Sequence, residues 1–571
     1  MRGHARPETF PGRSGCTGET AQGLASLVMS EQVGTLNIAT AWEAVADAVG
    51  DQTALAVTGN RTSWADYDNR AACLAGTLRS RGLAAGSKVA LYCHNGVEYP
   101  EAQYAAFKLR CVPANVNYRY LGDELAYILD NSDAEALFFD HSLADRVDAV
   151  REGFPALKAL VQIGGDTTPS WAISYEEALA TPPMQRIERS GSDLWFLYTG
   201  GTTGMPKAVM WSHDSLFANM AKTFASLGEA LPRTASEVAA AATRIAAAGS
   251  RVRQLCAAPL MHGTSGLSSL ATLTHGGMIT TLGQGSFDPD ELWTVVESEK
   301  ITMVTIVGDA FARPMLDSLD RAAKAGKAWN LTALRLLLSS GVMFSAPVKA
   351  GILAHHDCTI VDILGSSEGT GMGSQITSRE LEDAGTARFA LGERARVFND
   401  DGEDVVPGSG ERGRLALGDP IPLGYYKDAA KTEQTFPMIG GRRWSIPGDW
   451  ATVDADGTIT LLGRGSACIN TGGEKVYPEE VEEAIKEHPG VVDCNVVGLP
   501  DERWGQAVAA VVELSPAGGV GIDEDILNRH ARTVLAGYKV PKRILLVDTI
   551  QRGPNGKPDY KWARGALEAT F

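Results

Sequence analysis

Residues 197–209, LYTGGTTGMPKAV, are the part of the chain best suited to chemistry. Their glycines carry no Cβ, so several backbone N–H groups can converge on one anion. The threonine hydroxyls add neutral donors, and Lys207 adds a positive charge. This is not a Walker A loop, because Met205 and Pro206 precede the lysine and Ala208 follows it. We therefore predict a nucleotide-phosphate loop of another kind, in preference to a Gly/Thr-rich linker, directly after a buried strand.

A second glycine motif supports a different class of enzyme. Residues 365–369 read GSSEG, which fits the GxSxG nucleophile elbow, and they follow a predicted strand. A serine hydrolase of the α/β type, with Ser367 as its nucleophile, is therefore a rival hypothesis. Asp449 followed by His488 or His530 would keep the chain order that such a hydrolase requires. This hypothesis gives no role to the phosphate loop or to the C-terminal part of the chain.

A third motif, GSGERG at residues 408–413, matches the sequence of the dinucleotide-binding pattern GxGxxG but not its structural context. That fingerprint follows a strand and opens a helix. Here turn-like residues precede the motif and a strand-like run at 414–417 follows it. We therefore expect no nicotinamide site.

Length and composition describe a folded, acidic chain of several structural units. Its 571 residues exceed one ordinary core, and 44% hydrophobic with 21% charged residues is typical of globular proteins. The net charge of −17 argues against a nucleic-acid binder that relies on neutralising phosphates. The eight cysteines form no CxxC pair, which favours the reducing cytoplasm over a disulfide framework or zinc site. No run reaches the ~18 apolar residues of a transmembrane helix.

The elements that must position these motifs alternate between helix and strand over the first two thirds of the chain. Such alternation predicts βαβ units and a mainly parallel sheet. Predicted helices cover 42–49, 66–81 and an Ala-rich surface segment at 235–248 that reads as an insertion. Predicted strands cover 88–93, 136–139, 277–282, 303–307, 334–338 and 359–364.

Beyond residue 388 the pattern changes to short strands separated by Gly and Asp turns, which indicates a β-rich subdomain. Predicted strands there are 414–417, 450–453 and 458–462. A new unit follows, with strands at 491–498, 507–514 and 543–547 and a helix that begins at Pro478. The fold class is therefore α/β: a large N-terminal domain of stacked αβ subdomains with a β-rich subdomain, and a small α+β C-terminal domain. We place the domains at 29–464 and 465–571.

The first 28 residues lack apolar periodicity and the apolar core of a signal peptide. We expect a disordered, dispensable leader there, or a start codon assigned upstream of the true one at Met29.

Seven motifs in the chain occur in the order of one family. They lie at 198–207, 259–263 (PLMHG), 365–368, 445–449 (SIPGD), 463–464, 472–482 (GGEKVYPEEVE) and 554–557 (PNGK). Together they resemble the adenylate-forming superfamily of acyl-CoA synthetases, luciferases and peptide-synthetase adenylation domains. The resemblance covers residues 36–567. Segments 115–120 (NVNYRY) and 305–314 (TIVGDAFARP) are most similar to bacterial acyl-CoA synthetases for fatty acids and steroid side-chain acids.

The resemblance implies an AMP-forming acyl-CoA synthetase that uses ATP, Mg²⁺ and CoA. A carboxylate would attack the α-phosphorus of ATP to give an acyl-adenylate and pyrophosphate, and the acyl group would then pass to CoA. In the family the small C-terminal domain rotates between these half-reactions. That rotation would withdraw Lys557 and present the strand at Gly472 and Gly473 to the CoA tunnel.

The resemblance also implies a role for each matching residue. Lys557 would neutralise charge between the carboxylate and the α-phosphate, and His262 would be a gate between the acyl pocket and the CoA tunnel. Glu368 would act in catalysis as the magnesium carboxylate, with Thr199 beside it. The implied cofactor-binding residues are Thr199, Gly200, Gly201, Thr202, Thr203, Gly204, Lys207, Gly341, Gly365, Ser366, Ser367, Asp449 (ribose hydroxyls), Arg464, Gly472 and Gly473.

The chain departs from the family pattern at several positions. Ser367 replaces a threonine but keeps the hydroxyl, and Leu364 stands where an aromatic ring often lies against adenine. Residues 340–343 lack the usual Ala-Pro, and the hinge position holds Ser466 in place of Asp or Lys.

The sequence also gives expectations about the acyl acceptor and the carboxylic acid substrate. The chain ends shortly after Lys557, so we expect free CoA as acceptor and not a carrier protein. Luciferase-type oxidation shares the motifs, whereas a non-catalytic binding module is disfavoured by the retained lysines and carboxylates. Gly266, Gly276 and Gly277 would leave a deep apolar cavity for a medium- or long-chain or steroid acid. A homodimer is left open.

Overall fold

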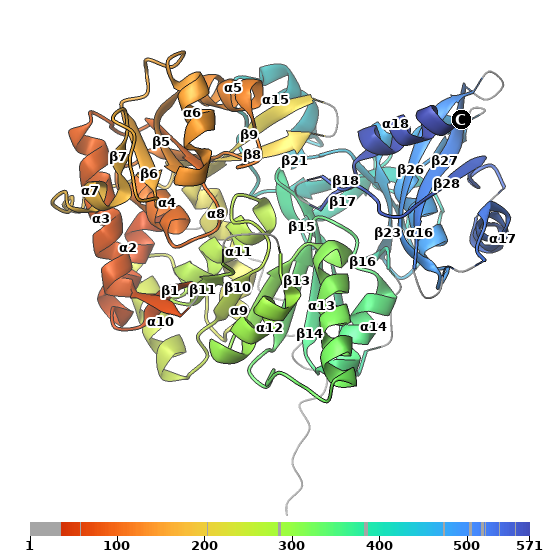
Figure 1. Cartoon of the computed structure of the whole chain (residues 1–571), viewed down its shortest axis with the longest axis horizontal. Coiled ribbons are helices and arrows are strands. Elements are labelled where there is room, and N and C mark those ends of the chain that lie inside the picture. Colours follow the sequence, from red (N-terminus) through yellow and green to blue (C-terminus); the bar gives the residue numbers. More distant parts are fainter. Residues whose placement is uncertain are drawn as a thin grey trace, which may run out of the picture. The chain divides into compact units, whose positions relative to one another are not determined.

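The computed structural model describes residues 36–571 apart from 58, 202–203, 284–286, 382–385, 472–473, 502–504, 516–518, 520, 536 and 554–555. The predicted leader at 1–28 lies outside the described residues. The α/β fold is confirmed: among these residues, helices cover sheets of fifteen, eight and five strands, whose arrangement Figure 1 shows.

The eight-stranded sheet carries the phosphate loop. Its strand order is β19-β9-β8-β4-β3-β5-β6-β7, and β4, β3, β5 and β6 run parallel, as the alternating pattern predicts. The strands are β3 (Lys88–Tyr92), β4 (Val112–Asn115), β5 (Ala134–Asp140), β6 (Ala159–Ile163), β7 (Ile173–Ser174), β8 (Leu194–Gly201), β9 (Gly204–Ser212) and β19 (Gly424–Tyr425).

The fifteen-stranded sheet is parallel from β1 to β14 and antiparallel from β14 onward. Its first strands are β1 (Thr53–Val57), β2 (Asn60–Ser63), β10 (Arg253–Cys256), β11 (Met278–Thr281), β12 (Met303–Ile306), β13 (Leu336–Ser340) and β14 (Thr359–Ser366). The antiparallel part begins at β15 (Gly369–Thr377), before the β-rich region predicted from residue 388. It also holds β16 (Arg388–Leu391), β17 (Ala395–Phe398), β18 (Arg412–Gly418), β20 (Met438–Ile439), β21 (Arg442–Ser445), β22 (Asp449–Val453) and β23 (Thr458–Arg464).

The helices of these two sheets begin where the sequence offers caps. The helix predicted at 42–49 starts earlier, at Ile38, because Oδ1 of Asn37 accepts from the backbone N–H of Ala39 at 2.8 Å. The helices are α2 (Ile38–Val49), α3 (Trp64–Ser80), α4 (Glu98–Lys108), α5 (Gly122–Ser132), α6 (Ala144–Arg151), α7 (Tyr175–Leu179), α8 (His213–Asn219), α9 (Ala221–Ser226), α10 (Ala235–Ala247), α11 (Gly263–Thr274), α12 (Pro289–Ser298), α13 (Gly308–Lys324), α14 (Ala346–His355) and α15 (Ala429–Thr435).

The C-terminal sheet has a core of its own and is blue in Figure 1. Apolar residues of α16 (Pro478–Lys486) cover one face, and those of α18 (Tyr560–Thr570) cover the other. The sheet contains β24 (Ile469–Thr471), β25 (Glu474–Val476), β26 (Val491–Asp501), β27 (Gly505–Leu514) and β28 (Arg543–Val547), and α17 (Glu524–Val534) precedes β28.

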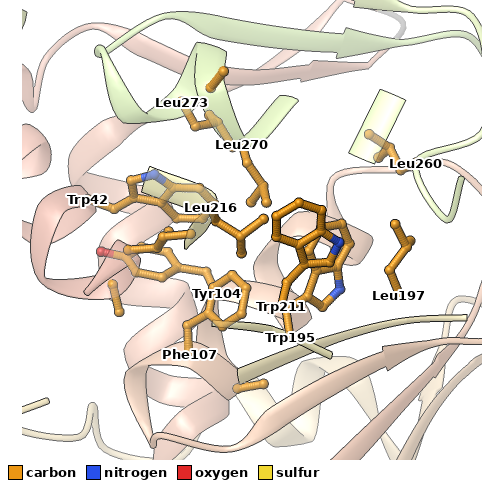
Figure 2. Packing of buried hydrophobic residues seen from close by; sticks show 14 of the residues in the cluster. Trp42, Tyr104, Phe107, Trp195, Leu197, Trp211, Leu216, Leu260, Leu270 and Leu273 are labelled. Carbon is orange, nitrogen blue, oxygen red and sulfur yellow. The ribbon is translucent and has the colours of Figure 1, made fainter. Parts of the chain in front are cut away.

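Buried aromatic side chains join the first helices to the strands of the phosphate loop (Figure 2). Trp195 on β8 lies directly opposite Trp211 on β9, and both are at most 1% exposed. On α2, Trp42 packs edge-on against Tyr104 of α4 with ring centroids 5.0 Å apart. Such rings combine large apolar burial with oriented packing, so this core fixes the base of the loop.

The glycines expected to open an acyl cavity instead allow close packing. A Cβ on Gly266 would lie 2.9 Å from the carbonyl oxygen of Leu260 and 3.4 Å from the Trp195 ring. Gly276 and Gly277 are likewise in close contact with neighbouring chain atoms. The expectation of a deep cavity at these three positions is therefore wrong, because glycine space is already filled by protein.

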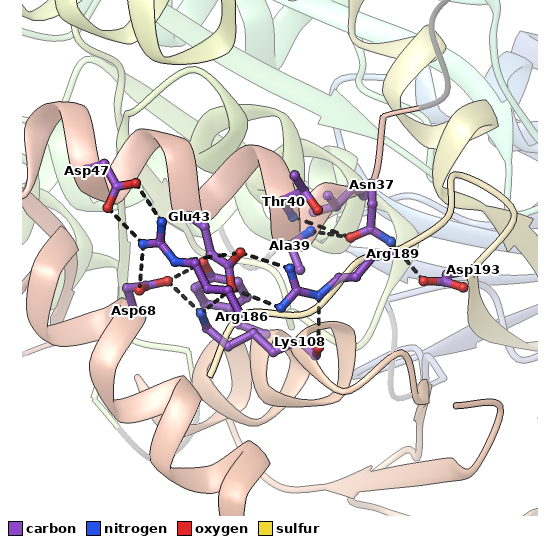
Figure 3. Close-up of polar contacts among 12 residues, drawn as sticks. Asn37, Ala39, Thr40, Glu43, Asp47, Asp68, Lys108, Arg186, Arg189 and Asp193 are labelled. Atoms are coloured by element: carbon purple, nitrogen blue, oxygen red, sulfur yellow. Dashed lines mark hydrogen bonds and ion pairs between the residues drawn. The ribbon is translucent and has the colours of Figure 1, made fainter. Parts of the chain in front are cut away.

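A buried ionic network ties the helices to the segment that enters β8 (Figure 3). The ammonium of Lys108 lies 2.9 Å from Oε1 of Glu43 and 2.7 Å from Oδ1 of Asp68. The guanidinium of Arg189 donates twice to the Glu43 carboxylate, at 2.8 and 2.9 Å. The side chains of Lys108, Arg189 and Glu43 are 2, 1 and 6% exposed, so each charge depends on its partners for solvation.

We predict that Lys108→Ala destabilises the protein by about 3–5 kcal/mol, because Glu43 and Asp68 both lose a buried cation and Asp68 keeps only the more distant Arg186, at 3.5 Å. Guanidinium unfolding followed by tryptophan fluorescence measures the loss. Arg321→Ala is the control: its pair with Asp290 is 2.9 Å long and 59% exposed on both sides. That change should cost no more than about 1 kcal/mol. Equal effects of the two substitutions would contradict this account of the network.

Candidate active site

The predicted phosphate loop is the turn of the hairpin formed by β8 and β9. Register places Thr199 opposite Lys207 and Gly201 opposite Gly204. Thr202 and Thr203, which follow Gly201 in the sequence, lie outside the described residues. A hairpin rooted between buried tryptophans is not a linker, and its closely spaced glycines suit an anion.

Lys207 has a carboxylate partner that the sequence did not reveal. Its ammonium pairs with Oδ2 of Asp428, which also caps α15 through Oδ1 and the backbone N–H of Lys431 at 3.0 Å. The hydrogen bond from Lys207 is the main reason why the pKa of Asp428 lies below its usual value. The pair orients Lys207 at the root of the hairpin.

Asn115, at the end of β4, joins two of the candidate site's loops. Its Oδ1 accepts from the backbone N–H of Tyr198 at 2.6 Å, and its Nδ2 donates to the carbonyl oxygen of Tyr198 at 3.0 Å. The same Nδ2 donates to the carbonyl oxygen of Met261 at 2.8 Å. The side chain thus fixes the strand before the phosphate turn to the loop that carries His262.

The GxSxG motif forms a turn between antiparallel strands. Ser366 ends β14 and Gly369 begins β15, and these two residues face each other across the hairpin. A nucleophile elbow needs a strand followed by a helix. The serine-hydrolase hypothesis is therefore wrong. A Cβ on Gly365 would lie 3.1 Å from the carbonyl oxygen of Gly369, so glycine permits this tight hairpin.

The hairpin turn is held against the phosphate strands. Trp211 on β9 donates from Nε1 to the carbonyl oxygen of Ser367 at 3.0 Å. A Cβ on Gly263 would lie 3.5 Å from Leu197 of β8 and 3.9 Å from the Ser367 hydroxyl. These contacts bring the predicted residues 365–368 beside the phosphate hairpin and the start of α11.

Glu368 is buried and oriented by two groups that sequence reasoning missed. The hydroxyl of Tyr425 donates to Oε1 of Glu368 at 2.7 Å, and the hydroxyl of Ser445 donates to its carbonyl oxygen at 2.8 Å. The described part of the chain contains no cluster of three metal-binding side chains. A single fixed carboxylate still fits Mg²⁺, which commonly binds one or two carboxylates together with substrate phosphates and water.

Two further predicted positions lie on neighbouring strands. Asp449 begins β22, Arg464 ends β23, and the two residues are directly opposite in register. Asp449 is buried, at 9% exposure. Gly341 has a φ of +93°, which favours glycine, and follows Ser340, whose carbonyl oxygen accepts from Thr264 at 3.4 Å.

His262 is the N-cap residue of α11, and its Nε2 is shielded from solvent although the residue as a whole is only half-buried. Burial lowers the pKa of this imidazole to about 4, and the positive charges of Lys557 and Arg119 lower it further. Within the described residues, its Nε2 has no hydrogen-bond partner. A neutral ring with a free nitrogen therefore lies where the C-terminal lysine approaches.

The C-terminal loop approaches the start of α13. A Cβ on Gly556 would lie 3.1 Å from Cβ of Ala310, and the next residue is Lys557. The structure thus brings Lys557 toward the loop of His262. Gly472 and Gly473, predicted for the second half-reaction, lie outside the described residues between β24 and β25.

Asn115, Tyr425 and Asp428 were missed because their roles depend on distant partners. Asn115 lies 83 positions from Tyr198, and Tyr425 lies 57 positions from Glu368. One hint was available, since Asn115 opens the segment 115–120 that resembles bacterial acyl-CoA synthetases.

Comparison with known proteins assigns the family. The AMP-binding enzyme family matches residues 42–426, and the AMP-binding enzyme C-terminal domain matches residues 480–557. The chain belongs to the AMP-binding enzyme family. It is 42% identical to the 3-oxocholest-4-en-26-oate–CoA ligase of Rhodococcus rhodochrous, over 93% of this chain and 95% of that one. It is 40% identical to the medium/long-chain-fatty-acid–CoA/3-oxocholest-4-en-26-oate–CoA ligase of Mycolicibacterium smegmatis, over 93% and 97%.

Solved structures share the fold. The anthranilate CoA ligase AuaEII in complex with anthranoyl-AMP has a TM-score of 0.79 at 21% identity, covering 94% of this chain and 98% of that chain. ATP-bound MatB from Rhodopseudomonas palustris has a TM-score of 0.76 at 25% identity, covering 94% and 100%. Both likenesses extend over the N-terminal sheets and the C-terminal sheet together.

The lowered pKa of the His262 imidazole predicts a specific pH dependence of stability. The folded pKa of about 4 lies below the ordinary 6.5, so only the unfolded chain binds this proton as pH falls from 6.5 to 4. The stabilisation is fully present above pH 6.5 and is lost toward pH 4, in total about 3 kcal/mol. In His262→Gln, the free energy of unfolding should fall less steeply across this window in urea titrations.

His275→Gln is the matched comparison for this prediction. Burial lowers the pKa of His275 to about 4 as well, yet this residue lies at the far end of α11. Its substitution should flatten the pH dependence in the same way while leaving acyl activation intact. An unchanged pH dependence in His262→Gln would show that the imidazole is not held neutral.

Proposed function

We propose that this chain activates a large apolar carboxylic acid, a fatty acid or a steroid side-chain acid, as its acyl-adenylate and then transfers the acyl group to CoA. The observation that carries the proposal is the approach of Lys557 to the loop of His262, beside the phosphate hairpin and Glu368. Lys557, from the C-terminal unit, thereby approaches the site in which the phosphate hairpin can hold the triphosphate of ATP and Glu368 can hold a metal ion.

In the first half-reaction a carboxylate oxygen of the acid attacks the α-phosphorus, and the bond to pyrophosphate breaks. The hairpin N–H groups and Lys207 hold the phosphates, and Asp449 accepts from the ribose hydroxyls. Mg²⁺ held by Glu368 and Thr199 would neutralise phosphate charge. Lys557 lies between two anions that must meet, so it acts by position and charge and transfers no proton.

In the second half-reaction the thiol sulfur of CoA attacks the acyl carbon, AMP leaves, and the thiol proton passes to solvent. Gly472 and Gly473 belong to this step, after a rotation of the C-terminal domain, residues 465–571, relative to residues 29–464. His262 stands beside the reacting carbonyl as a neutral gate. This division of labour explains why one site needs both Lys557 and the glycine-rich strand.

The choice of acid rests on the relatives. Two ligases at 40 and 42% identity are named for 3-oxocholest-4-en-26-oate, and one of them also for medium- and long-chain fatty acids. A feruloyl-CoA synthase of Amycolatopsis is more distant, at 30%. No helix in the described part of the chain has the length and apolar character to cross a bilayer. We place the enzyme in the cytoplasm, with a homodimer as a proposal that sedimentation analysis would decide.

Pyrophosphate release from ATP should depend on a large apolar acid. The screen compares acetate, hexanoate, palmitate, an aryl acid and a steroid side-chain carboxylate, each with and without CoA. Palmitate or the steroid acid should give the highest kcat/KM, and acyl-CoA should form only when CoA is present. Preference for acetate or the aryl acid would contradict the proposed substrate class.

Lys557→Ala should separate the half-reactions. Adenylation should lose roughly 2–4 kcal/mol of transition-state stabilisation, the loss expected for one group that neutralises developing charge. Thioester formation from a supplied acyl-adenylate should stay near the wild-type rate, because the lysine has been withdrawn by then. Equal loss in both half-reactions would contradict the two-conformation account.

A further inference from the structure

Backbone hydrogen bonds join the described residues next to Lys557. The N–H of Gly553 donates to the carbonyl oxygen of Lys557 at 2.8 Å, and the N–H of Gly556 donates to the carbonyl oxygen of Gly553 at 2.9 Å. Arg552 and Pro558 pair as an antiparallel bridge. The described residues on either side of positions 554–555 are therefore tied to one another, and the position of Lys557 depends on what holds residue 552.

The side chain of Arg552 holds the loop to the C-terminal sheet. Its Nε lies 2.7 Å from Oδ2 of Asp493 and its Nη2 lies 2.5 Å from Oδ1, which is a bidentate pair. Its remaining Nη1 donates to the carbonyl oxygen of Gly556 at 3.0 Å. One guanidinium thus connects β26 to the residue directly before the lysine.

Asp493 is itself fixed, which makes the pair directional. It lies on β26, where its Oδ1 also accepts from the backbone N–H of Cys494 at 2.8 Å. The Arg552 and Asp493 side chains are 20 and 16% exposed, so the pair is largely shielded from solvent. A planar guanidinium can bind a carboxylate through two of its nitrogens and a carbonyl oxygen through the third. A lysine at position 552 could not make all three contacts.

We infer that Arg552, oriented by Asp493, is a positioning residue for the adenylation step. The inference rests on the proposed function of Lys557 in that step. The guanidinium sets the backbone at Gly556, where the loop meets Ala310 of α13, and thereby sets where the Lys557 ammonium lies. A displacement of about 1 Å in a catalytic group can lower a rate by roughly 100-fold. The pair therefore affects the half-reaction that uses the lysine and spares the other.

The test measures both half-reactions in the full-length chain, with palmitate or whichever acid the screen selects. Arg552→Lys and Asp493→Asn should lower kcat for acid-dependent ATP–pyrophosphate exchange by ~10- to 100-fold. KM for ATP and acid should stay within about threefold, because neither residue contacts substrate. Thioester formation from preformed acyl-adenylate should remain within about twofold of wild type. The double variant should be no worse than Arg552→Lys alone, because both changes remove one linkage.

Lys539→Ala is the matched control. Lys539 pairs with Glu480 in the same unit at comparable exposure, 20 and 27%, and within the described residues neither side chain forms a hydrogen bond or ion pair with the loop around Lys557. It should change neither half-reaction. Retained exchange in both Arg552→Lys and Asp493→Asn, alongside loss in Lys557→Ala, would overturn the inference. So would equal loss in both half-reactions with a lowered melting temperature, which marks a merely structural pair. A wild-type chain without exchange on any acid would instead contradict the proposed function.

Discussion

The three hydrogen bonds of the buried Asn115 amide are the constraint on which the candidate site depends. They attach both backbone groups of Tyr198 and the carbonyl of Met261 to the end of β4. A glycine-rich turn has little intrinsic order, so its N–H groups converge on an anion only if its base is fixed. Asn115 supplies that fixed base and also sets the distance from the phosphate hairpin to the loop of His262.

Electrostatics of the site follow from this arrangement. Two cations, Lys207 and Lys557, approach from different parts of the chain, and the first is oriented by Asp428. Glu368 is the buried carboxylate, fixed by the Tyr425 hydroxyl. The imidazole of His262 is held neutral, because burial and the positive charges of Lys557 and Arg119 all lower its pKa. The site can therefore attract the negative charges of ATP and of the acid through its two lysines. No described group in it has to lose a proton before the reaction starts.

Sequence patterns predicted the elements well where apolar periodicity was clear. The strand predicted at 543–547 has the same bounds as β28, and the helix predicted from Pro478 begins at that residue as α16. The motif order also predicted the family. Local patterns failed where the outcome depends on distant packing. The GxSxG motif at 365–369 matches a nucleophile elbow in sequence, but β15 pairs antiparallel with β14 and no helix follows. Gly266 suggests open space in sequence, but the Trp195 ring packs against it. Asn115 and its partners were missed for the same reason.

The central claim is that the acid's own oxygen becomes bonded to the α-phosphorus of ATP in this site. The most direct measurement gives the enzyme a carboxylic acid labelled with oxygen-18 in its carboxylate, together with ATP and CoA. The mass of the AMP product is then determined by mass spectrometry. The account predicts one labelled oxygen in the AMP phosphate, because that oxygen stays with phosphorus when the thiol attacks the acyl carbon. Unlabelled AMP, or label in inorganic phosphate with formation of ADP, would contradict it.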